Sequence, residues 1–400
     1  MEKIFIDRLD HQGRGISYKG GKIIFVDGSL DDEEVICEID VEKKKYYEGH
    51  VTEILKMSSS RVKPKCPYYE LCGGCNIMHM SYEKQLDFKK KKLSSIINKY
   101  ASSNVAINDI VGSKQFNYRN KITLKVNKKI GLYKKQSNDL VNINECLIVD
   151  ANINKVIKVL SEFIFDDIKQ IIIRSSINTN EIMVCFDNEV NDEIISELKK
   201  YVSSIYVKDK LIYGNSFLTE VLGDYKFVIS PSSFFQVNTD QAFNIYMKVL
   251  EYCKLEKNDV VLDLYCGTGT IGIFLSKHCK SVIGIELNPD AIKNAWINAE
   301  KNKISNIEFY TGDVGKVINN IKCKPNVIVV DPPRSGLSKE TINFIINLNV
   351  KKLIYVSCDP MTLARDIKLL SDKYSLQEVT PFDMFPNTYH VESVCILERK

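Results

Sequence analysis

Short apolar runs that end in an acidic residue or a thiol recur in the second half of the chain, and they constrain its fold most. The first run, residues 260–264, is β-branched and enters a glycine turn at 266–269, before a predicted helix at 271–278. Glycines at such a junction let backbone N–H groups approach a ligand, and a helix N-terminus favours negative charge. The next run, 281–287, carries Glu286 roughly 20 residues past the glycines, where an acid can bind ribose hydroxyls. This order predicts a Rossmann-like α/β domain that binds a nucleoside-containing cofactor.

Three further strand ends carry reactive side chains. Asp313 follows the run 307–310, Asp331 follows 326–330 and Cys358 follows 353–356. Alone, each acid is as consistent with a helix cap or solvated turn, and most thiols are small apolar filler. In open α/β sheets, however, ligands bind beyond the carboxyl ends of the strands. Together these residues predict a ligand crevice that contains a sulfur nucleophile.

Two cofactors fit the glycine turn, NAD and S-adenosylmethionine. Gly272 nominally completes the G-x-G-x-x-G spacing of nicotinamide-binding proteins. Too little chain follows for the second half of a nicotinamide-binding fold, however, and no hydride-transfer site is recognisable downstream. The sequence therefore favours S-adenosylmethionine.

Five motifs carry a resemblance to a known family. They lie at residues 234–238, 263–270, 331–334, 357–360 and 390–393. In this order the chain resembles the S-adenosylmethionine-dependent RNA uracil-C5 methyltransferases that act on tRNA and ribosomal RNA. The resemblance extends over the whole chain and implies a class I methyltransferase domain. One departure is Thr270, where many relatives have asparagine.

The resemblance implies a nucleophile, Cys358, and a base, Glu392. C5 of uracil is too weak a nucleophile for a sulfonium methyl group until a thiolate adds to C6, and a base must then remove the C5 proton. Without the family match, Glu392 would be read as an exposed carboxylate on an edge strand, and His390 is interpreted as structural. The implied cofactor-binding residues are Gln236, Tyr265, Thr270, Glu286, Asp313 and Asp331.

A cysteine-rich turn is the second strong signal. Cys66, Cys72 and Cys75 form a C-x5-C-x2-C pattern, and Cys146 is an isolated fourth candidate. Four thiolates hold zinc or an iron–sulfur cluster. Structural zinc sites usually have two short cysteine pairs, so the asymmetry favours [4Fe-4S], which many relatives bind at these positions. Disulfides are the alternative, and the remaining cysteines are expected to fill cores in a reducing cytoplasm.

The chain predicts three domains. Residues 1–57 resemble the TRAM module, a small five-stranded RNA-binding barrel with predicted strands at 22–26 and 34–39. Its lysine run at 43–45 would contact phosphate, or simply form a solvated turn. Residues 58–229 form a central domain with the iron–sulfur loop and an RNA-contacting surface, in which the segment 116–121 mixes rings and cations. Residues 230–400 form the methyltransferase domain.

Charge and composition narrow the possible partners. The 55 basic and 51 acidic residues give a net charge of only +4, so any RNA-binding surface must be a local patch. The helix predicted at 82–100 contains four lysines at 89–92, expected on a solvated face. The N-terminus has no long apolar segment, so we expect neither a signal peptide nor a membrane span. We expect a cytoplasmic monomer that does not bind membranes.

The favoured interpretation is a methyltransferase that makes 5-methyluridine in 23S ribosomal RNA. The barrel and cluster loop favour this branch, because tRNA-acting bacterial relatives typically lack them. A tRNA T-loop uridine is the alternative substrate. A non-catalytic iron–sulfur RNA-binding protein and an amino-nitrogen methyltransferase are further alternatives, and a covalent RNA adduct would distinguish the favoured enzyme from the second of these.

Overall fold

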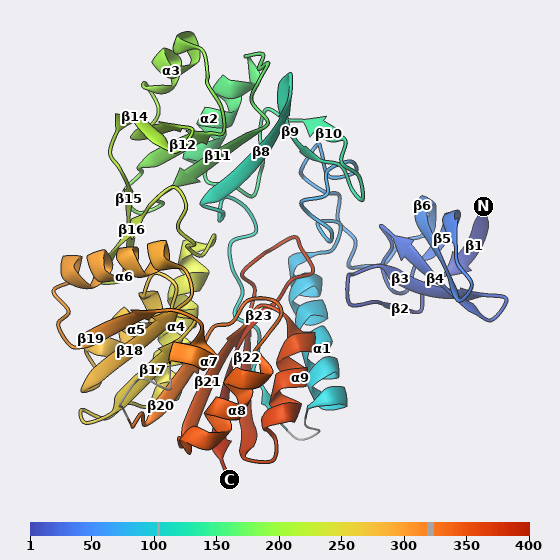
Figure 1. The fold of residues 1–400 in the computed structure, drawn as a ribbon. Coiled ribbons are helices and arrows are strands. Elements are labelled where there is room, and N and C mark those ends of the chain that lie inside the picture. The colour runs from blue at the N-terminus through green and yellow to red at the C-terminus, as the bar shows by residue number, and fades with distance from the viewer. Residues whose placement is uncertain (102–104, 318–323) are drawn as a thin grey trace. The chain divides into compact units, whose positions relative to one another are not determined.

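The computed structural model describes residues 1–101, 105–317 and 324–400, which form two compact units. The first unit comprises Met1–Lys92, Leu132–Val141 and Phe385–His390, and the second comprises Leu93–Gly131, Asn142–Met384 and Val391–Lys400. No helix in the described part of the chain is long and apolar enough to cross a membrane. Figure 1 shows the fold of both units.

A six-stranded sheet, rather than the predicted five strands, opens the first unit. Its order is β1-β5-β6-β4-β3-β2. The strands are β1 (Glu2–Phe5), β2 (Arg8–Leu9), β3 (Gly15–Lys19), β4 (Lys22–Asp27), β5 (Glu34–Glu42) and β6 (Tyr46–Lys56). Alternate residues of β4 and β5 point inward, and Ile24, Val26 and Val35 form a small core. The strands predicted at 22–26 and 34–39 are therefore confirmed and slightly longer.

The helix α1 (Tyr82–Tyr100) has its predicted bounds, but its lysine run does not lie wholly on a solvated face. Lys89 is fully buried and donates a hydrogen bond to the carbonyl of Phe385 at 3.0 Å. Lys92 donates to the carbonyl of Tyr389 at 2.9 Å. The solvated-face prediction is wrong for Lys89, because backbone carbonyls distant in sequence compensate the buried ammonium group.

A seven-stranded sheet forms the first part of the second unit, although residues 132–141 of this sheet segment belong to the first unit. Strands β8, β11, β12, β13 and β14 lie in this order in a sheet that also includes β9 and β10. Their bounds are β8 (Lys121–Asn127), β9 (Lys129–Tyr133), β10 (Leu140–Asn142), β11 (Gln170–Ser175), β12 (Ile182–Phe186), β13 (Ser204–Val207) and β14 (Lys210–Gly214). Two helices, α2 (Ala151–Ser161) and α3 (Asp192–Leu198), belong to this part, and a hairpin of β15 (Leu218–Leu222) and β16 (Tyr225–Ile229) follows. Ile122 and Leu124 of β8 are buried, whereas Lys121 and Thr123, which alternate with them, are half-exposed.

An eight-stranded sheet with the order β19-β18-β17-β20-β21-β23-β22-β7 forms the rest of the second unit. Strands β17 to β21 run parallel, and β23 is antiparallel between β21 and β22. The strands are β7 (Ala106–Ile107), β17 (Val260–Leu264), β18 (Ser281–Glu286), β19 (Ile307–Thr311), β20 (Val327–Val330), β21 (Lys352–Ser357), β22 (Tyr374–Phe382) and β23 (Glu392–Arg399). The helices are α4 (Thr239–Cys253), α5 (Thr270–Ser276), α6 (Pro289–Lys301), α7 (Val314–Val317), α8 (Lys339–Leu348) and α9 (Pro360–Leu370).

Helices flank both faces of this sheet (Figure 1). On one face, Leu262, Ile328 and Leu353 pack in a single buried cluster with Ile345 of α8 and Leu363 of α9. The near-continuous apolar sequence of each parallel strand follows from this double coverage. The architecture is thus the predicted α/β fold, with the carboxyl ends of β17, β18, β19, β20 and β21 at one edge.

The cysteines expected to fill cores are mostly buried. Cys37, Cys253, Cys266, Cys279 and Cys395 are buried and Cys185 is half-buried, whereas Cys323 lies outside the described residues. Burial raises the pKa of the Cys185 thiol to about 12. These thiols are therefore protonated at neutral pH and behave as apolar side chains.

Candidate active site

Cys358 and Glu392 meet at the end of one antiparallel ladder. Ser357 of β21 pairs with Ser393 of β23. Cys358, which follows Ser357, and Glu392, which precedes Ser393, therefore both lie at the edge where the parallel strands end. Glu392 is only 5% exposed, because β23 lies inside the sheet between β21 and β22. The reading of Glu392 as an exposed edge-strand carboxylate is therefore wrong.

Burial and neighbouring charges raise the pKa of both groups. Burial raises the pKa of the Cys358 thiol to about 12, with further contributions from Glu392 and Asp331. Burial also raises the pKa of Glu392 to about 8, and the charge of Asp331 acts in the same direction. The guanidinium of Arg334 opposes both shifts. A carboxyl group with a pKa near neutrality can accept or hold a proton at physiological pH.

The glycine turn is tied to the acid that follows it. The carboxylate of Glu286 accepts hydrogen bonds from the N–H of Gly267 at 3.2 Å and from the N–H of Asn288 at 2.9 Å. Gly269 has a φ of 77° and caps α5, and a Cβ atom there would lie 2.7 Å from the Phe309 ring. Only glycine suits this position, since both its backbone conformation and its close contact exclude a side chain.

Tyr265 begins the turn and has an unusual backbone conformation. Its φ of 64° lies in the left-handed region, which bulky residues rarely adopt. Its hydroxyl lies 3.0 Å from the hydroxyl of Thr341, which fixes the ring at the strand end. Such strain is common where a backbone is shaped around a ligand.

Asp263 is a site residue that the sequence reasoning did not single out, although it lies in the motif at 263–270. It is fully buried on β17, and its Oδ2 atom accepts a hydrogen bond from the N–H of Gly272 at 3.0 Å. Its Oδ1 atom is buried and has no hydrogen-bond partner among the described residues. Burial and the charge of Asp331 raise the pKa of Asp263 to about 8, and burial raises that of Asp331 to about 7. A crowded pair of carboxyl groups, one of which has an oxygen without a partner, is suited to a cationic ligand such as a sulfonium compound.

A second overlooked residue, Tyr246, contacts a predicted one. The hydroxyl of Thr270 donates to the hydroxyl of Tyr246 at 3.3 Å. Tyr246 lies on α4, is 4% exposed, and has its pKa raised by burial and by Asp331, Asp263 and Glu392. A fully buried tyrosine hydroxyl beside three carboxyl groups links α4 to the strand ends. An isolated aromatic residue at helical spacing gives no sequence signal for this placement.

The other predicted site residues lie at varied depths. Gln236 is half-buried, and its carbonyl accepts a hydrogen bond from the Asn120 side chain at 2.9 Å. Asp313 is exposed and precedes α7. His390, expected to be structural, contacts the rings of Phe385 and Tyr389 in the first unit.

The predicted iron–sulfur ligands do not form a recognisable metal site. Cys66, Cys72 and Cys75 are half-buried in a turn-rich loop of the first unit, and Cys146 belongs to the second unit. Over residues 1–101, 105–317 and 324–400, no group of three or more His, Cys, Asp and Glu side chains is placed to hold a metal ion. The prediction of a cluster is therefore not confirmed.

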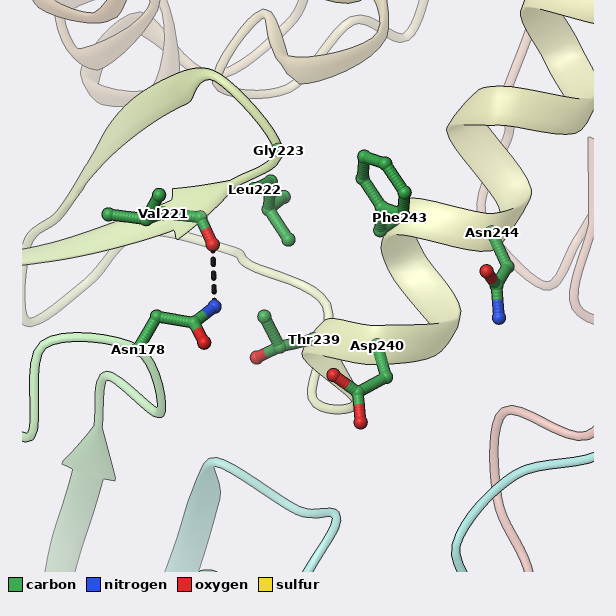
Figure 2. A pocket seen from close by; sticks show the side chains of 8 residues that line it. All are labelled: Asn178, Val221, Leu222, Gly223, Thr239, Asp240, Phe243 and Asn244. Atoms are coloured by element: carbon green, nitrogen blue, oxygen red, sulfur yellow. Dashed lines mark hydrogen bonds between the residues drawn. The ribbon is translucent and has the colours of Figure 1, made fainter.

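A separate cavity of about 280 Å³ lies at the start of α4 (Figure 2). Its walls are the β15–β16 hairpin, the first turns of α4 and Asn178, whose side chain donates to the carbonyl of Val221 at 2.6 Å. None of the predicted site residues lines this cavity. The candidate active site is therefore defined by the strand ends.

Comparison with known proteins agrees with this geometry. Residues 81–400 match the model of a family described as tRNA (Uracil-5-)-methyltransferase. A Clostridium tetani protein described as an uncharacterized RNA methyltransferase is 34% identical, over 98% of this chain and 95% of its own length. A Staphylococcus aureus protein with the same description is 35% identical, over 98% of this chain and 96% of its own.

A solved structure extends the similarity to the fold. Pyrococcus abyssi tRNA (uracil-54, C5)-methyltransferase, in complex with S-adenosyl-L-homocysteine, aligns with a TM-score of 0.81. It is 30% identical, and the alignment covers 99% of this chain and 100% of that protein. The chain belongs to the RNA uracil-5-methyltransferase family and is an S-adenosylmethionine-dependent RNA methyltransferase.

Proposed function

We propose that this enzyme methylates C5 of specific uridines in 23S ribosomal RNA through a covalent adduct of Cys358. The observation that supports this chemistry is the ladder register, in which Cys358 and Glu392 both adjoin the terminal pair Ser357–Ser393. Membership of the family supplies the reaction class. The N-terminal six-stranded sheet and the cysteine loop support a ribosomal substrate, because tRNA-acting bacterial relatives typically lack both features.

The mechanism requires two protein groups at different steps. The thiolate of Cys358 adds to C6 of uracil, and the electron pair of the C5–C6 bond moves into an enolate. When bound, S-adenosylmethionine would supply the electrophilic methyl group for C5 and would leave as S-adenosylhomocysteine. Glu392 removes the remaining C5 proton, the C5–C6 double bond re-forms and the thiolate leaves.

The electrostatics require the thiol to lose its proton before it can attack. With its pKa near 12, the Cys358 thiol is protonated when no RNA is bound. The cation of Arg334 lowers the pKa of both Cys358 and Glu392, so it stabilises the charged forms that the reaction needs. The raised pKa of the Cys358 thiol protects the nucleophile from reaction in the absence of substrate.

The cofactor is proposed to occupy the crevice above β17, β18 and β20. The ribose of the cofactor would bind Glu286, whose carboxylate accepts a hydrogen bond from the glycine turn. The cationic end of the cofactor would face Asp331 and Asp263. The orphaned Oδ1 atom of Asp263 supports this fit. Gln236, Tyr265, Thr270 and Asp313 complete the proposed cofactor-binding set.

We retain the domain division at 1–57, 58–229 and 230–400 as part of the proposal, with the first domain as a TRAM module. A [4Fe-4S] cluster on Cys66, Cys72, Cys75 and Cys146 remains a prediction that rests on the cysteine pattern alone. No step of the proposed reaction uses the cluster. Iron analysis tests it independently of activity.

A second candidate substrate is a T-loop uridine of tRNA. The observation in its favour is the similarity to the Pyrococcus abyssi enzyme, whose described substrate is uracil-54 of tRNA. Both substrates would use the same Cys358 and Glu392 chemistry. The choice between them therefore requires analysis of the RNA.

Mass spectrometry of 5-methyluridine in 23S ribosomal RNA and in tRNA from a deletion strain separates the two. The proposal expects loss at discrete 23S positions, restoration by the intact gene and no restoration by Cys358→Ala. Loss confined to tRNA would favour the second candidate. Unchanged 5-methyluridine in both RNAs would refute both.

A further inference from the structure

The geometry points to a phosphate-binding site on the central sheet, in which Arg119, Lys121 and Arg174 hold a phosphodiester group of the RNA substrate. This inference rests on the proposed function, because it assigns part of the RNA-binding surface. The three residues lie in the second unit, at one end of the β8–β11 pair.

The sheet register brings the three cations together. Arg174 of β11 is the direct antiparallel partner of Lys121 at the start of β8, so both side chains leave the same face of the sheet. Arg119 lies two residues before Lys121, and its Nε atom donates to the carbonyl of Lys121 at 2.8 Å. Like charges directly across a ladder destabilise it, so the arrangement needs a compensating ligand.

Arg174 is a buried cation whose hydrogen bonds are incomplete. It is 4% exposed, and one terminal N–H group donates to the carbonyl of Ser233 at 2.6 Å. Its Nε atom is buried and lacks a hydrogen-bond partner within the described ranges. A buried charge is costly unless it is paired and hydrogen-bonded. The unsatisfied guanidinium is therefore suited to bind an anion.

Lys121 responds to the same excess of positive charge. Burial, Arg174 and Arg119 together lower its pKa to about 8, and only the Cys185 thiol acts in the opposite direction. In the part of the chain that the structure describes, no carboxylate forms an ion pair with Arg119, Lys121 or Arg174.

A phosphodiester is the anion that fits this set. The planar fork of arginine matches phosphate oxygens, and lysine adds a point charge. The net charge of +4 requires any RNA contact to be local, as this cluster is. Arg174 also holds the carbonyl of Ser233, in the loop that leads to Gln236 of the proposed cofactor site. A phosphate bound here would anchor the RNA next to that loop.

The test compares two lysine variants in binding to a short uridine-containing RNA oligonucleotide. Lys121→Gln should weaken binding about tenfold and reduce the slope of log affinity against log salt by about one, with S-adenosylmethionine affinity unchanged. The control is Lys200→Gln, since Lys200 already pairs with Glu197 at 2.6 Å and should leave the slope intact. Equal slopes for wild type and Lys121→Gln would overturn the site.

A pH series gives a second, independent readout. Wild-type RNA affinity should fall as pH rises through about 8, because Lys121, faced by Arg119, Arg174 and Cys185, loses its proton there. Lys121→Arg should bind as tightly as wild type at low pH and lose this dependence, because arginine stays charged. Persistence of the pH dependence in Lys121→Arg would contradict the assignment.

The outcomes separate this site from the proposed function. RNA binding that depends on Lys121 without any methylation would leave the site standing and refute the proposed function. If the enzyme methylates RNA but Lys121→Gln binds RNA as tightly as wild type, the phosphate site is refuted and the proposed function stands. If inorganic phosphate binds in a Lys121-dependent manner but does not compete with the oligonucleotide, the ligand is not the RNA backbone and the inference fails.

Discussion

Glu392 lies across the end of the β21–β23 ladder from Cys358, one residue beyond the pair formed by Ser357 and Ser393. The proposed nucleophile and base are therefore positioned by backbone hydrogen bonds between two interior strands. Such a ladder is among the most rigid supports a fold offers. Burial raises the pKa of both groups, and the charge of Glu392 raises the pKa of the Cys358 thiol further.

The first prediction concerns the reactivity of the Cys358 thiol without RNA. In Glu392→Gln, the negative charge that helps raise the thiol pKa is absent, so Cys358 should be alkylated faster by iodoacetamide. The difference should emerge only above about pH 8, because below the pKa of Glu392 the wild-type carboxyl is already neutral. Peptide mass spectrometry gives the rate at Cys358 separately from the other thiols. Equal rates at pH 9 would show that Glu392 does not act on the thiol.

The second prediction concerns cofactor affinity. Glu286→Ala should weaken S-adenosylmethionine binding roughly tenfold or more, since a charged hydrogen bond contributes about 1.5–3 kcal/mol. Part of the loss would come from the glycine turn, because Glu286 also accepts from Gly267. The affinity of Glu286→Gln, which retains one acceptor oxygen, should lie between those of wild type and Glu286→Ala. Calorimetry with unchanged affinity in both variants would remove Glu286 from the pocket.

The third prediction concerns Asp263 and the pH dependence of stability. Its folded pKa of about 8 lies above its ordinary value of 3.8, so its stabilising contribution is complete below about 3.8 and is lost by about 8. Asp263→Asn should therefore flatten the decline of the melting temperature between pH 5 and 8. Asp240→Asn, at an exposed position, serves as the control. A decline as steep in Asp263→Asn as in wild type would mean that Asp263 is ionised throughout this range.

The fourth prediction concerns iron. Anaerobically purified protein should be brown and contain about four irons per chain. Cys72→Ser should abolish the colour, whereas Cys185→Ser should retain it, because Cys185 lies on β12 outside the cysteine loop. Colourless protein, or protein with stoichiometric zinc, would refute the iron–sulfur prediction.

Local patterns in the sequence were sufficient for the elements that position the site. The bounds of α1 and β8 follow from their periodicity. The strands that end at Glu286 or directly before Asp331 and Cys358 follow from apolar runs that stop at polar residues. These signals depend only on residues close together in the chain.

Features that depend on distant partners could not be predicted. The burial of Lys89 requires the carbonyl of Phe385, and the interior position of Glu392 requires β22 to add beyond β23. Tyr246 reaches Thr270 from another helix. Arg174 and Lys121 oppose each other only through the register of β8 and β11. Sequence periodicity carries no information about such pairings.

Covalent adduct formation tests the central claim, that Cys358 and Glu392 act at different steps, most directly. Each variant is incubated with substrate RNA and S-adenosylmethionine and resolved on a denaturing gel. Glu392→Gln should form a shifted protein–RNA band whose uracil is methylated, because an amide cannot accept the C5 proton. Cys358→Ala should bind RNA and form no such band. Methylation of uridine by both variants, or an adduct through another cysteine, would contradict the account.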